Sequence, residues 1–445
     1  MTMVASFTVF FSYYNIMKHY SFMTYMLDLG INIQMLFITI NGEILNFVVW
    51  LRPIMYLILP FYALMPRAEL LLTIQPLIVA LGAFPLYLLA RDELANRGAG
   101  LCFAALYLLY PPIHGLTSFD FHVHAFIPLF VLFALYFYKK QVYSKCVFFI
   151  IMAVMTIEYV YPVILFLGIY FLVTRQYRVL KFVRSGKVNI RVIGNVRIIL
   201  TTLTISCIMT LYFFFIRSRF FYDFSQAFFS GFITTSFQDK FNYVIKLFGP
   251  LGFSPLLSPL ELLPSLPWFM YSFWSAEREY VMIYNQYSAF VAPFIFFASI
   301  KGIKAIISDN KARILLRVFV FLFISIVLFN FTSSPLLISP ALTKPWPTIG
   351  EREIVLSNLV SSIPQNASVL TQNNIAPHLA NRYGLFSSPA HLKGPVDYIL
   401  VDTKNPFFMN GPPNPPVGVG LQKVLEKWSY TVVFEYDGIF LYKRI

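Results

Sequence analysis

The sequence predicts a polytopic α-helical membrane protein that ends in a small α/β domain. Of its 445 residues, 58% are hydrophobic and only 12% are charged, whereas a soluble domain carries about 25% charged residues. The apolar residues form long blocks such as "CVFFIIMAVMTIEYVYPVILFLGIYFLV", and helices of this length satisfy their backbone inside a bilayer. After residue 332 the long apolar blocks stop. We therefore divide the chain into a transmembrane domain, residues 1–332, and an extracytoplasmic domain, residues 333–445.

The basic residues predict the orientation of the spans and do not indicate a nucleic-acid partner. The formal net charge is +14, and the Lys and Arg residues concentrate in short loops beside the apolar runs. This distribution is typical of cytoplasmic loops. The clearest example is 175–197, with seven Arg or Lys and no acid, and 138–145 and 301–313 are weaker examples. We place all three loops inside the cell.

The apolar segments between these loops predict about eleven spans, with the lipid bilayer as the main partner. The first residues lack the basic region and cleavage site of a signal peptide, so we expect a retained first helix. Residues 145–174 are too long for one straight helix and carry Glu158 and Pro162 near the middle. We expect two short helices there, which meet outside. Further spans are expected at 70–90, 99–112, 124–138, 198–216, 286–300 and 313–332, with a pair of short helices in the proline-broken segment 241–272.

The C-terminal segment has the patterns of a small α/β domain. A Pro- and Ser-rich linker leads to a helical pattern at 351–363, and short helices are expected at 374–382 and 420–428. Strands are expected at 367–372 and 397–402, followed by a hairpin at 431–444 that turns at Asp437-Gly438. Each span carries the chain to the other side of the membrane, and counting the spans from the cytoplasmic loops places this domain outside.

Several polar side chains fall in segments that the same count of spans places outside. A carboxylate near membrane depth is costly, which favours a functional role. Alternatively, Asp28 is a solvated carboxylate at the membrane interface that only caps a helix. Convergence of several acids and histidines on one side favours a site. Its candidate residues are Asp28, Gln34, Arg52, Asp120, His122, His124, Glu158 and Arg278.

The segment "DFHVH" at 120–124 allows more than one interpretation. In an extended loop His122 and His124 point the same way, and with Asp120 they form a candidate site for a divalent metal. Alternatively the loop is simply solvated, His122 orients Asp120, or Asp120 caps the next helix. The spacing is not diagnostic of any metal. The three cysteines lie inside apolar runs without a CxxC pair, which favours core packing.

A series of motifs resembles a known family over nearly the whole chain. In order they are "LDLGINIQMLF", "RPIMYLILPFYALMPRAELLL", "SFDFHVHAFIPLF", "FGPLGFSPLLSPLELLPSLPW", "IPQNASVLTQNNIAPHLANR" and "DYILVD". Together they resemble the prokaryotic predicted-membrane-protein family catalogued as domain of unknown function number twenty seventy-nine. That family is similar in layout to the GT-C class of lipid-linked-sugar glycosyltransferases, which includes protein O-mannosyltransferases and the aminoarabinose transferase of lipid A.

The resemblance implies a transferase that moves a sugar from a polyprenyl phosphate to a protein or glycan acceptor at the outer face. An outer loop, residues 18–69, would carry Asp28 as the catalytic base. Such chemistry needs a carboxylate to activate the acceptor hydroxyl and a cation to stabilise the departing phosphate. Glu158 is the second candidate catalytic carboxylate. The candidates for substrate binding are Gln34, Arg52, Asp120, His122 and Arg278, with a metal at His122 and His124 as a further source of positive charge.

Departures from the family pattern keep two other interpretations open. The family has His-Phe-Ser where this chain has Trp50-Leu51-Arg52, and Lys-Glu-Asp where it has Ile157-Glu158-Tyr159. A non-catalytic member that acts in envelope assembly would tolerate these changes. A transporter or flippase would use the segment 241–272 as a discontinuous helix pair, although no repeated half supports it. A P-loop and other nucleotide-binding motifs are absent, which disfavours an ATP-driven pump.

Overall fold

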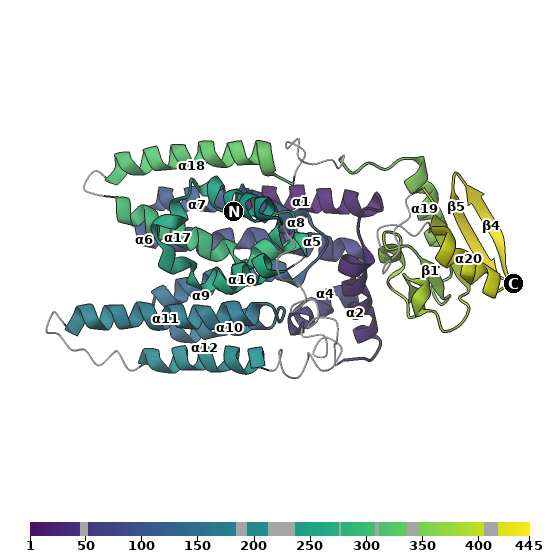
Figure 1. The fold of residues 1–445 in the computed structure, drawn as a ribbon, viewed down its shortest axis with the longest axis horizontal. Coiled ribbons are helices and arrows are strands. Elements are labelled where there is room, and N and C mark those ends of the chain that lie inside the picture. Colours follow the sequence, from purple (N-terminus) through teal and green to yellow (C-terminus); the bar gives the residue numbers. More distant parts are fainter. Residues whose placement is uncertain are drawn as a thin grey trace.

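The computed structural model describes residues 1–44, 52–183, 194–211, 236–275, 277–307, 311–335, 346–404 and 417–445. The chain is mostly helical. Its helices up to residue 335 pack side by side, and we call them the bundle. The described residues from 346 onward form a small sheet with flanking helices, which we call the sheet unit. Figure 1 shows the sheet unit at one end of the bundle, beside α1 and α2.

The bundle is built from many short helices. The N-terminal ones are α1 (Thr2–Tyr20), a π-helical turn (Met26–Gly30), α2 (Ile31–Ile40), a 3₁₀ turn (Pro53–Leu57), α4 (Leu59–Leu64), α5 (Ala68–Leu81) and α6 (Ala83–Leu94). The central ones are α7 (Arg97–Leu108), α8 (Pro111–Ser118), α9 (Phe126–Lys139), α10 (Tyr143–Val154), α11 (Val160–Val183) and α12 (Gly194–Leu211). The last ones are α15 (Phe237–Phe248), α16 (Leu266–Trp274), α17 (Ala292–Ile306) and α18 (Lys311–Ser333).

The expectation of about eleven spans is wrong for the residues that the structure describes. Only two helices there are long and apolar enough to cross a membrane, Ala68–Leu94 and Arg313–Ser333. A third span results if α7 and α8 count as one, since they meet at a 50° bend. Apolar blocks that look continuous in the sequence are divided at prolines, because proline removes a helical hydrogen bond and clashes with the preceding turn. Pro111 and Pro112 begin α8 in this way.

The expected breaks in two apolar segments are confirmed, although the pieces are not all short helices, since α11 has 24 residues. Residues 145–174 form the predicted pair of helices, α10 and α11, with the turn 155–159 between them. The proline-broken segment 241–272 contains the end of α15, three 3₁₀ turns and α16. The basic loop 175–197 lies partly outside the described residues, so its side chains receive no structural account.

The sheet unit contains the five-stranded sheet order β2-β1-β3-β5-β4. The strands are β1 (Val369–Thr371), β2 (Leu385–Phe386), β3 (Tyr398–Asp402), β4 (Tyr430–Tyr436) and β5 (Ile439–Arg444), accompanied by α19 (Glu351–Ser362) and α20 (Val417–Lys427). Strands β2 and β3 pair parallel to β1, and β5 pairs antiparallel to β3 and β4. The predicted hairpin turn is confirmed at Asp437 and Gly438, whose φ angles of 48° and 82° suit such a turn. Strand β2 was not expected, because its two residues carry no pattern.

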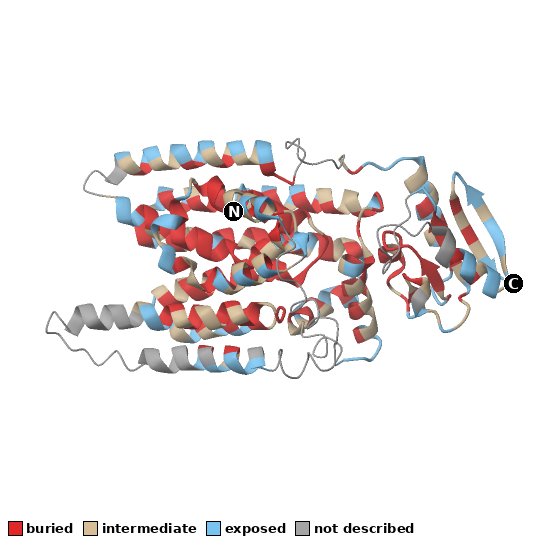
Figure 2. Ribbon diagram, in the orientation of Figure 1, coloured by how far each residue is buried: buried red, intermediate tan, exposed pale blue. Residues whose placement is uncertain are grey.

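Buried aromatic and polar contacts join the sheet unit to the bundle. The ring of His378 stacks on His19 of α1, with centroids 3.9 Å apart, and on Phe22, at 4.1 Å. The Tyr62 hydroxyl donates a 2.7 Å hydrogen bond to Asn381 Oδ1. In Figure 2 the buried residues of the sheet unit gather toward the bundle, whereas β4 shows mostly exposed residues. This junction is a packed interface.

Acid should loosen this junction. Burial lowers the pKa of His378 well below its ordinary value, with His19 adding to the effect, so the docked ring is neutral at pH 7. An undocked His378 binds a proton below about pH 6.5, and the docked state resists that proton, so docking weakens as the pH falls below this value. Lowering the pH from 7.5 to about 5.5 should therefore accelerate the release of the sheet unit by limited proteolysis. A His378→Phe variant keeps the ring but cannot be protonated, so its release should depend less on pH; an equal dependence would contradict the assignment.

Candidate functional site

The candidate site is organised around Asp28, which lies in the π-helical turn Met26–Gly30. One carboxylate oxygen, Asp28 Oδ1, lies 2.9 Å from His122 Nε2, and the other ring nitrogen, His122 Nδ1, lies 2.8 Å from the Asp120 carbonyl oxygen. Both ring nitrogens therefore face oxygen atoms, which fixes the orientation of the imidazole. The Asp28 side chain is still 21% exposed, so a ligand can reach it. Asp28 and His122 thus form a carboxyl–imidazole pair at hydrogen-bond distance.

Asp120 holds the backbone of this region and is not available to a substrate. Its side chain is 1% exposed, and its Oδ1 lies 2.7 Å from Lys18 Nζ. The Tyr25 N–H donates to its Oδ2 at 2.6 Å. These contacts join the end of α1 to the chain just before Asp28. The predicted substrate-binding role of Asp120 therefore gains no support, and neither does the capping alternative, because Ala125 precedes the first residue of α9.

Gln75 fixes the loop that carries His122. This fully buried side chain of α5 donates to the carbonyl oxygens of Thr117 and Phe119 at 3.1 and 3.0 Å. Its Oε1 accepts the His122 N–H at 2.7 Å. Sequence reasoning missed both Gln75 and Lys18. The available signal was their position in or beside an apolar run, where a polar side chain is expensive unless it has partners.

Arg52 reaches the cluster through Asn32 of α2. The Asn32 amide group donates to the Asp28 carbonyl oxygen at 2.8 Å and to the Phe121 carbonyl oxygen at 3.2 Å. Its Oδ1 accepts a 3.2 Å hydrogen bond from Arg52 Nη1. A cationic guanidinium is thus connected to the Asp28 segment by one buried amide. The sequence indicated Arg52, and Asn32 is the residue that places it.

Glu158 lies buried in the turn between α10 and α11. This turn is connected to the segment after Arg52, because the Ile54 N–H donates to the Met155 carbonyl oxygen at 2.9 Å. The proximity of Glu158 to Asp28 stays a prediction. Aromatic rings lie beside this turn: the Tyr159 ring centroid lies 6.0 Å from that of Tyr271, which lies 5.6 Å from that of Trp268.

These rings form an aromatic group in contact with His124. The Trp268 ring stacks on Tyr287 and Phe290, with centroids 5.1 and 4.7 Å apart. His124 meets the Tyr287 and Phe290 rings edge-on at 5.9 and 5.3 Å. Neither His124 nitrogen has a hydrogen-bond partner among the residues that the structure describes. His124 is therefore a buried imidazole without its usual partners, close to the ring of His122.

The donor set does not favour a metal at His122 and His124. Both nitrogens of His122 already face oxygen atoms of Asp28 and Asp120. Within the described part of the chain there is no group of three or more His, Cys, Asp or Glu residues placed to hold a metal ion. A Zn²⁺ or similar ion needs three or four such ligands. The metal interpretation therefore gains no support.

Two of the predicted residues make no hydrogen bond or ion pair to the cluster in the described part of the chain. Arg278 is 64% exposed and pairs with Asp239 at 3.0 Å. Gln34 lies half-buried on α2. The structure thus brings together Asp28, Asp120, His122 and Arg52, and it places His124 beside them.

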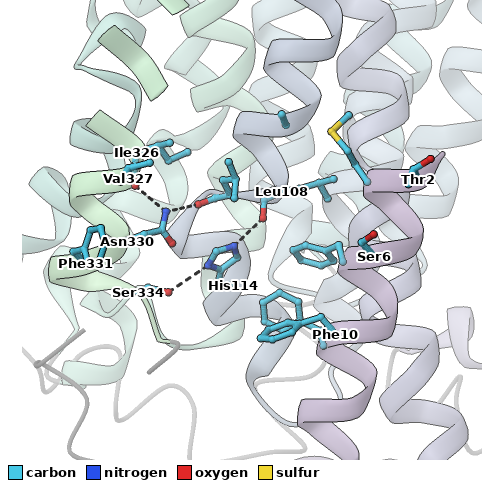
Figure 3. A pocket seen from close by; sticks show the side chains of 15 residues that line it. Thr2, Ser6, Phe10, Leu108, His114, Ile326, Val327, Asn330, Phe331 and Ser334 are labelled. Atoms are coloured by element: carbon cyan, nitrogen blue, oxygen red, sulfur yellow. Dashed lines mark hydrogen bonds between the residues drawn. The ribbon is translucent and has the colours of Figure 1, made fainter. Parts of the chain in front are cut away.

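A separate pocket of about 670 Å³ opens between α1, α7, α8 and α18. Figure 3 shows Phe10 and Ser6 of α1 on one side and Val327 and Phe331 of α18 on the other. Its walls are mostly apolar. His114 supplies one polar group, with Nδ1 3.3 Å from Ser334 Oγ and Nε2 2.8 Å from the Leu108 carbonyl oxygen. None of the predicted site residues lines this pocket.

Comparison with known proteins gives one family and one fold. The family model described as predicted membrane protein (DUF2079) matches residues 18–441. The crystal structure of ArnT from Cupriavidus metallidurans bound to undecaprenyl phosphate is similar, with a TM-score of 0.60 and 13% sequence identity. The alignment covers 100% of this chain and 97% of that chain. ArnT is a GT-C glycosyltransferase, and at this identity the similarity concerns the fold. No curated protein matches the sequence.

Proposed function

Since the chain belongs to this family of predicted membrane proteins, described as DUF2079, and resembles ArnT in fold, we propose that it is a membrane glycosyltransferase. It moves a sugar from a polyprenyl-phosphate donor to a hydroxyl-bearing acceptor at the outer face of the membrane. The observation that carries the proposal is the pairing of a partly exposed Asp28 with His122 at 2.9 Å. The polyprenyl donor class is supported by the undecaprenyl phosphate bound to ArnT.

In the proposed reaction Asp28 is the general base. Its carboxylate accepts the proton of the acceptor hydroxyl, and the resulting oxygen forms a bond to the anomeric carbon of the sugar. The bond between that carbon and the phosphate oxygen breaks, and polyprenyl phosphate leaves with the electron pair. Attack from the side opposite the phosphate inverts the anomeric centre. His122, whose Nε2 lies 2.9 Å from Asp28 Oδ1, holds the carboxylate in position for the arriving hydroxyl.

The departing phosphate needs a positive charge. Arg52 is the candidate that the geometry favours, because Asn32 connects it to the Asp28 segment. Arg278 is less suited, since it is exposed and paired with Asp239. A planar guanidinium offers two parallel N–H donors to phosphate oxygens, which stabilises the negative charge that develops as the bond breaks.

A direct assay tests this function. Purified protein in lipid nanodiscs is incubated with polyprenyl phosphates that carry labelled sugars and with membrane extracts as the acceptor source. We expect release of polyprenyl phosphate together with labelled acceptor. If donors of several sugars give no transfer above a protein-free control, the non-catalytic interpretation suggested by Ile157 and Tyr159 replaces the proposal.

The proposed function also requires the sheet unit to lie outside the cell. The number of spans no longer supports that location, because fewer spans are found in the described residues than the sequence predicted. We expect protease added to intact cells to cut within the described residues 346–404 and release a C-terminal fragment. Exposed β4 residues such as Val432 and Val433, 49% and 48% exposed, mark a face open to solvent. An epitope tag after Ile445 reports the fragment. A tag that becomes accessible only after the membrane is permeabilised would place the sheet unit inside.

A further inference from the structure

The sheet unit holds the backbone of the segment that carries Asp28. The Asn373 side chain accepts, through Oδ1, hydrogen bonds from the N–H groups of Met26 at 2.8 Å and Leu27 at 3.3 Å. The Asn373 carbonyl oxygen also accepts from the Met26 N–H at 2.8 Å. Asn373 is 1% exposed. Two residues before Asp28, the chain is thus bound to a part of the protein about 350 positions away in sequence.

The bundle holds the other side of the same segment. The Tyr25 N–H donates to Asp120 Oδ2, and the Asp28 N–H donates to the Tyr25 carbonyl oxygen at 3.3 Å. Every backbone N–H from Tyr25 to Asp28 therefore has an acceptor, and two of the four acceptors are supplied by Asn373. A polar backbone that is bonded throughout has few alternative conformations. The position of the Asp28 carboxylate consequently depends on both parts of the protein.

The place of Asn373 in the sheet explains why it can do this. Strand β1 lies between the parallel strands β2 and β3, so the chain leaves β1 toward one neighbour and returns on the other side. In α/β folds such a point, at the carboxyl ends of the strands, is where ligands bind. Here Gln372 donates across this edge to the Asp402 carbonyl oxygen at 2.9 Å. The next residue, Asn373, binds the Met26–Leu27 backbone where a ligand would otherwise bind.

We propose that Asn373 is a positioning residue through which the sheet unit holds the Asp28 segment in its reactive geometry. The edge of the sheet that binds ligands in related architectures serves here as a clamp on the candidate active site. The catalytic consequence rests on the proposed function, whereas the clamp itself does not. In this role Asn373 acts through the backbone of Met26 and Leu27.

The chemistry of the clamp defines the variants that test it. Only Oδ1 of the Asn373 side chain is used, since its Nδ2 has no hydrogen-bond partner among the described residues. Asn373→Asp keeps an acceptor oxygen that faces the same two N–H donors. Asn373→Leu keeps the size and removes the acceptor. Asn374 is a matched control, because it is 2% exposed and neither polar atom of its side chain has a partner in the described structure.

Hydrogen exchange of full-length protein in nanodiscs measures the clamp directly. In Asn373→Leu, the peptide that covers Leu27 should exchange about 3–10-fold faster, the effect of losing one buried hydrogen bond. Asn373→Asp should restore the wild-type rate, and Asn374→Leu should leave it unchanged. Equal acceleration in Asn373→Leu and Asn374→Leu would overturn the clamp, since it would show a general loosening of the junction. Unchanged exchange in Asn373→Leu would overturn it as well.

Kinetics then connect the clamp to catalysis. If the wild type transfers sugar, Asn373→Leu should lower kcat by up to about 10²-fold with a smaller change in KM, and Asn373→Asp should recover most of the rate. A loss of rate that Asn373→Asp does not rescue would contradict the positioning role. If the wild type transfers nothing while exchange responds as expected, the proposed function fails and the clamp stands.

Discussion

Replacing Asp28 with Asn should lower the rate of sugar transfer by about 10²–10⁴-fold and leave the fold intact. Asn has the same shape as Asp, but it cannot accept the proton of the acceptor hydroxyl. Its amide oxygen still accepts from His122, whose Nε2 lies 2.9 Å from Asp28 Oδ1. The backbone contacts of residue 28 do not involve its side chain, so Asn32 and Tyr25 keep their hydrogen bonds.

The measurement is the initial rate of polyprenyl phosphate release by purified wild type and Asp28→Asn in nanodiscs, at matched protein concentrations. Glu43→Gln supplies the control, because it removes an exposed acid after α2 without touching the cluster. Exchange protection of the 21–30 segment shows that the variant is folded. Equal rates for wild type and Asp28→Asn would exclude Asp28 as the base and would leave Glu158 as the remaining candidate.

The sequence predicted elements whose cause is local. The hairpin at Asp437-Gly438 was predictable because its turn requires positive φ angles, and Asp-Gly tolerates them. The division between α10 and α11 was predictable because Pro162 and Glu158 interrupt an overlong apolar block. The number of spans was not predictable in this way. Hydropathy reports that a segment is apolar, but it does not register that Pro111 and Pro112 begin a new helix, which gives the 50° bend between α7 and α8.

The candidate site was predictable only in part, for a related reason. The sequence predicted that Asp28 and His122 lie on the same side of the membrane, and in the structure their side chains are in direct contact. The roles within the set depend on contacts between distant segments. Asp120 looked like a ligand-binding carboxylate, because nothing in "DFHVH" reveals that Lys18, 102 positions earlier, neutralises it. The role of Asn373 could not be predicted from the sequence, because it arises from the docking of the sheet unit on the bundle.

The Lys18–Asp120 pair leads to the largest expected effect on stability. Replacing Asp120 with Ala should lower the free energy of unfolding by about 3–5 kcal/mol, because Lys18, which is 12% exposed, would lose its counter-charge. The Tyr25 N–H would lose its acceptor as well. Scanning fluorimetry in nanodiscs should show a clear decrease of the apparent Tm. Loss of the Tyr25 anchor should also accelerate hydrogen exchange in the 21–30 segment.

Two further variants separate the buried charge from the mere loss of an ion pair. Asp92 pairs with Lys140 at the same 2.7 Å distance, but these side chains are 25% and 46% exposed. Asp92→Ala should therefore change stability by only about 0–1 kcal/mol. The double variant Lys18→Met with Asp120→Leu removes both buried charges, and apolar replacement of such pairs is often neutral. It should recover much of the Tm lost in Asp120→Ala. If the double variant is as unstable as the single one, the Asp120 contact to Tyr25, and not the stranded Lys18 charge, carries the cost.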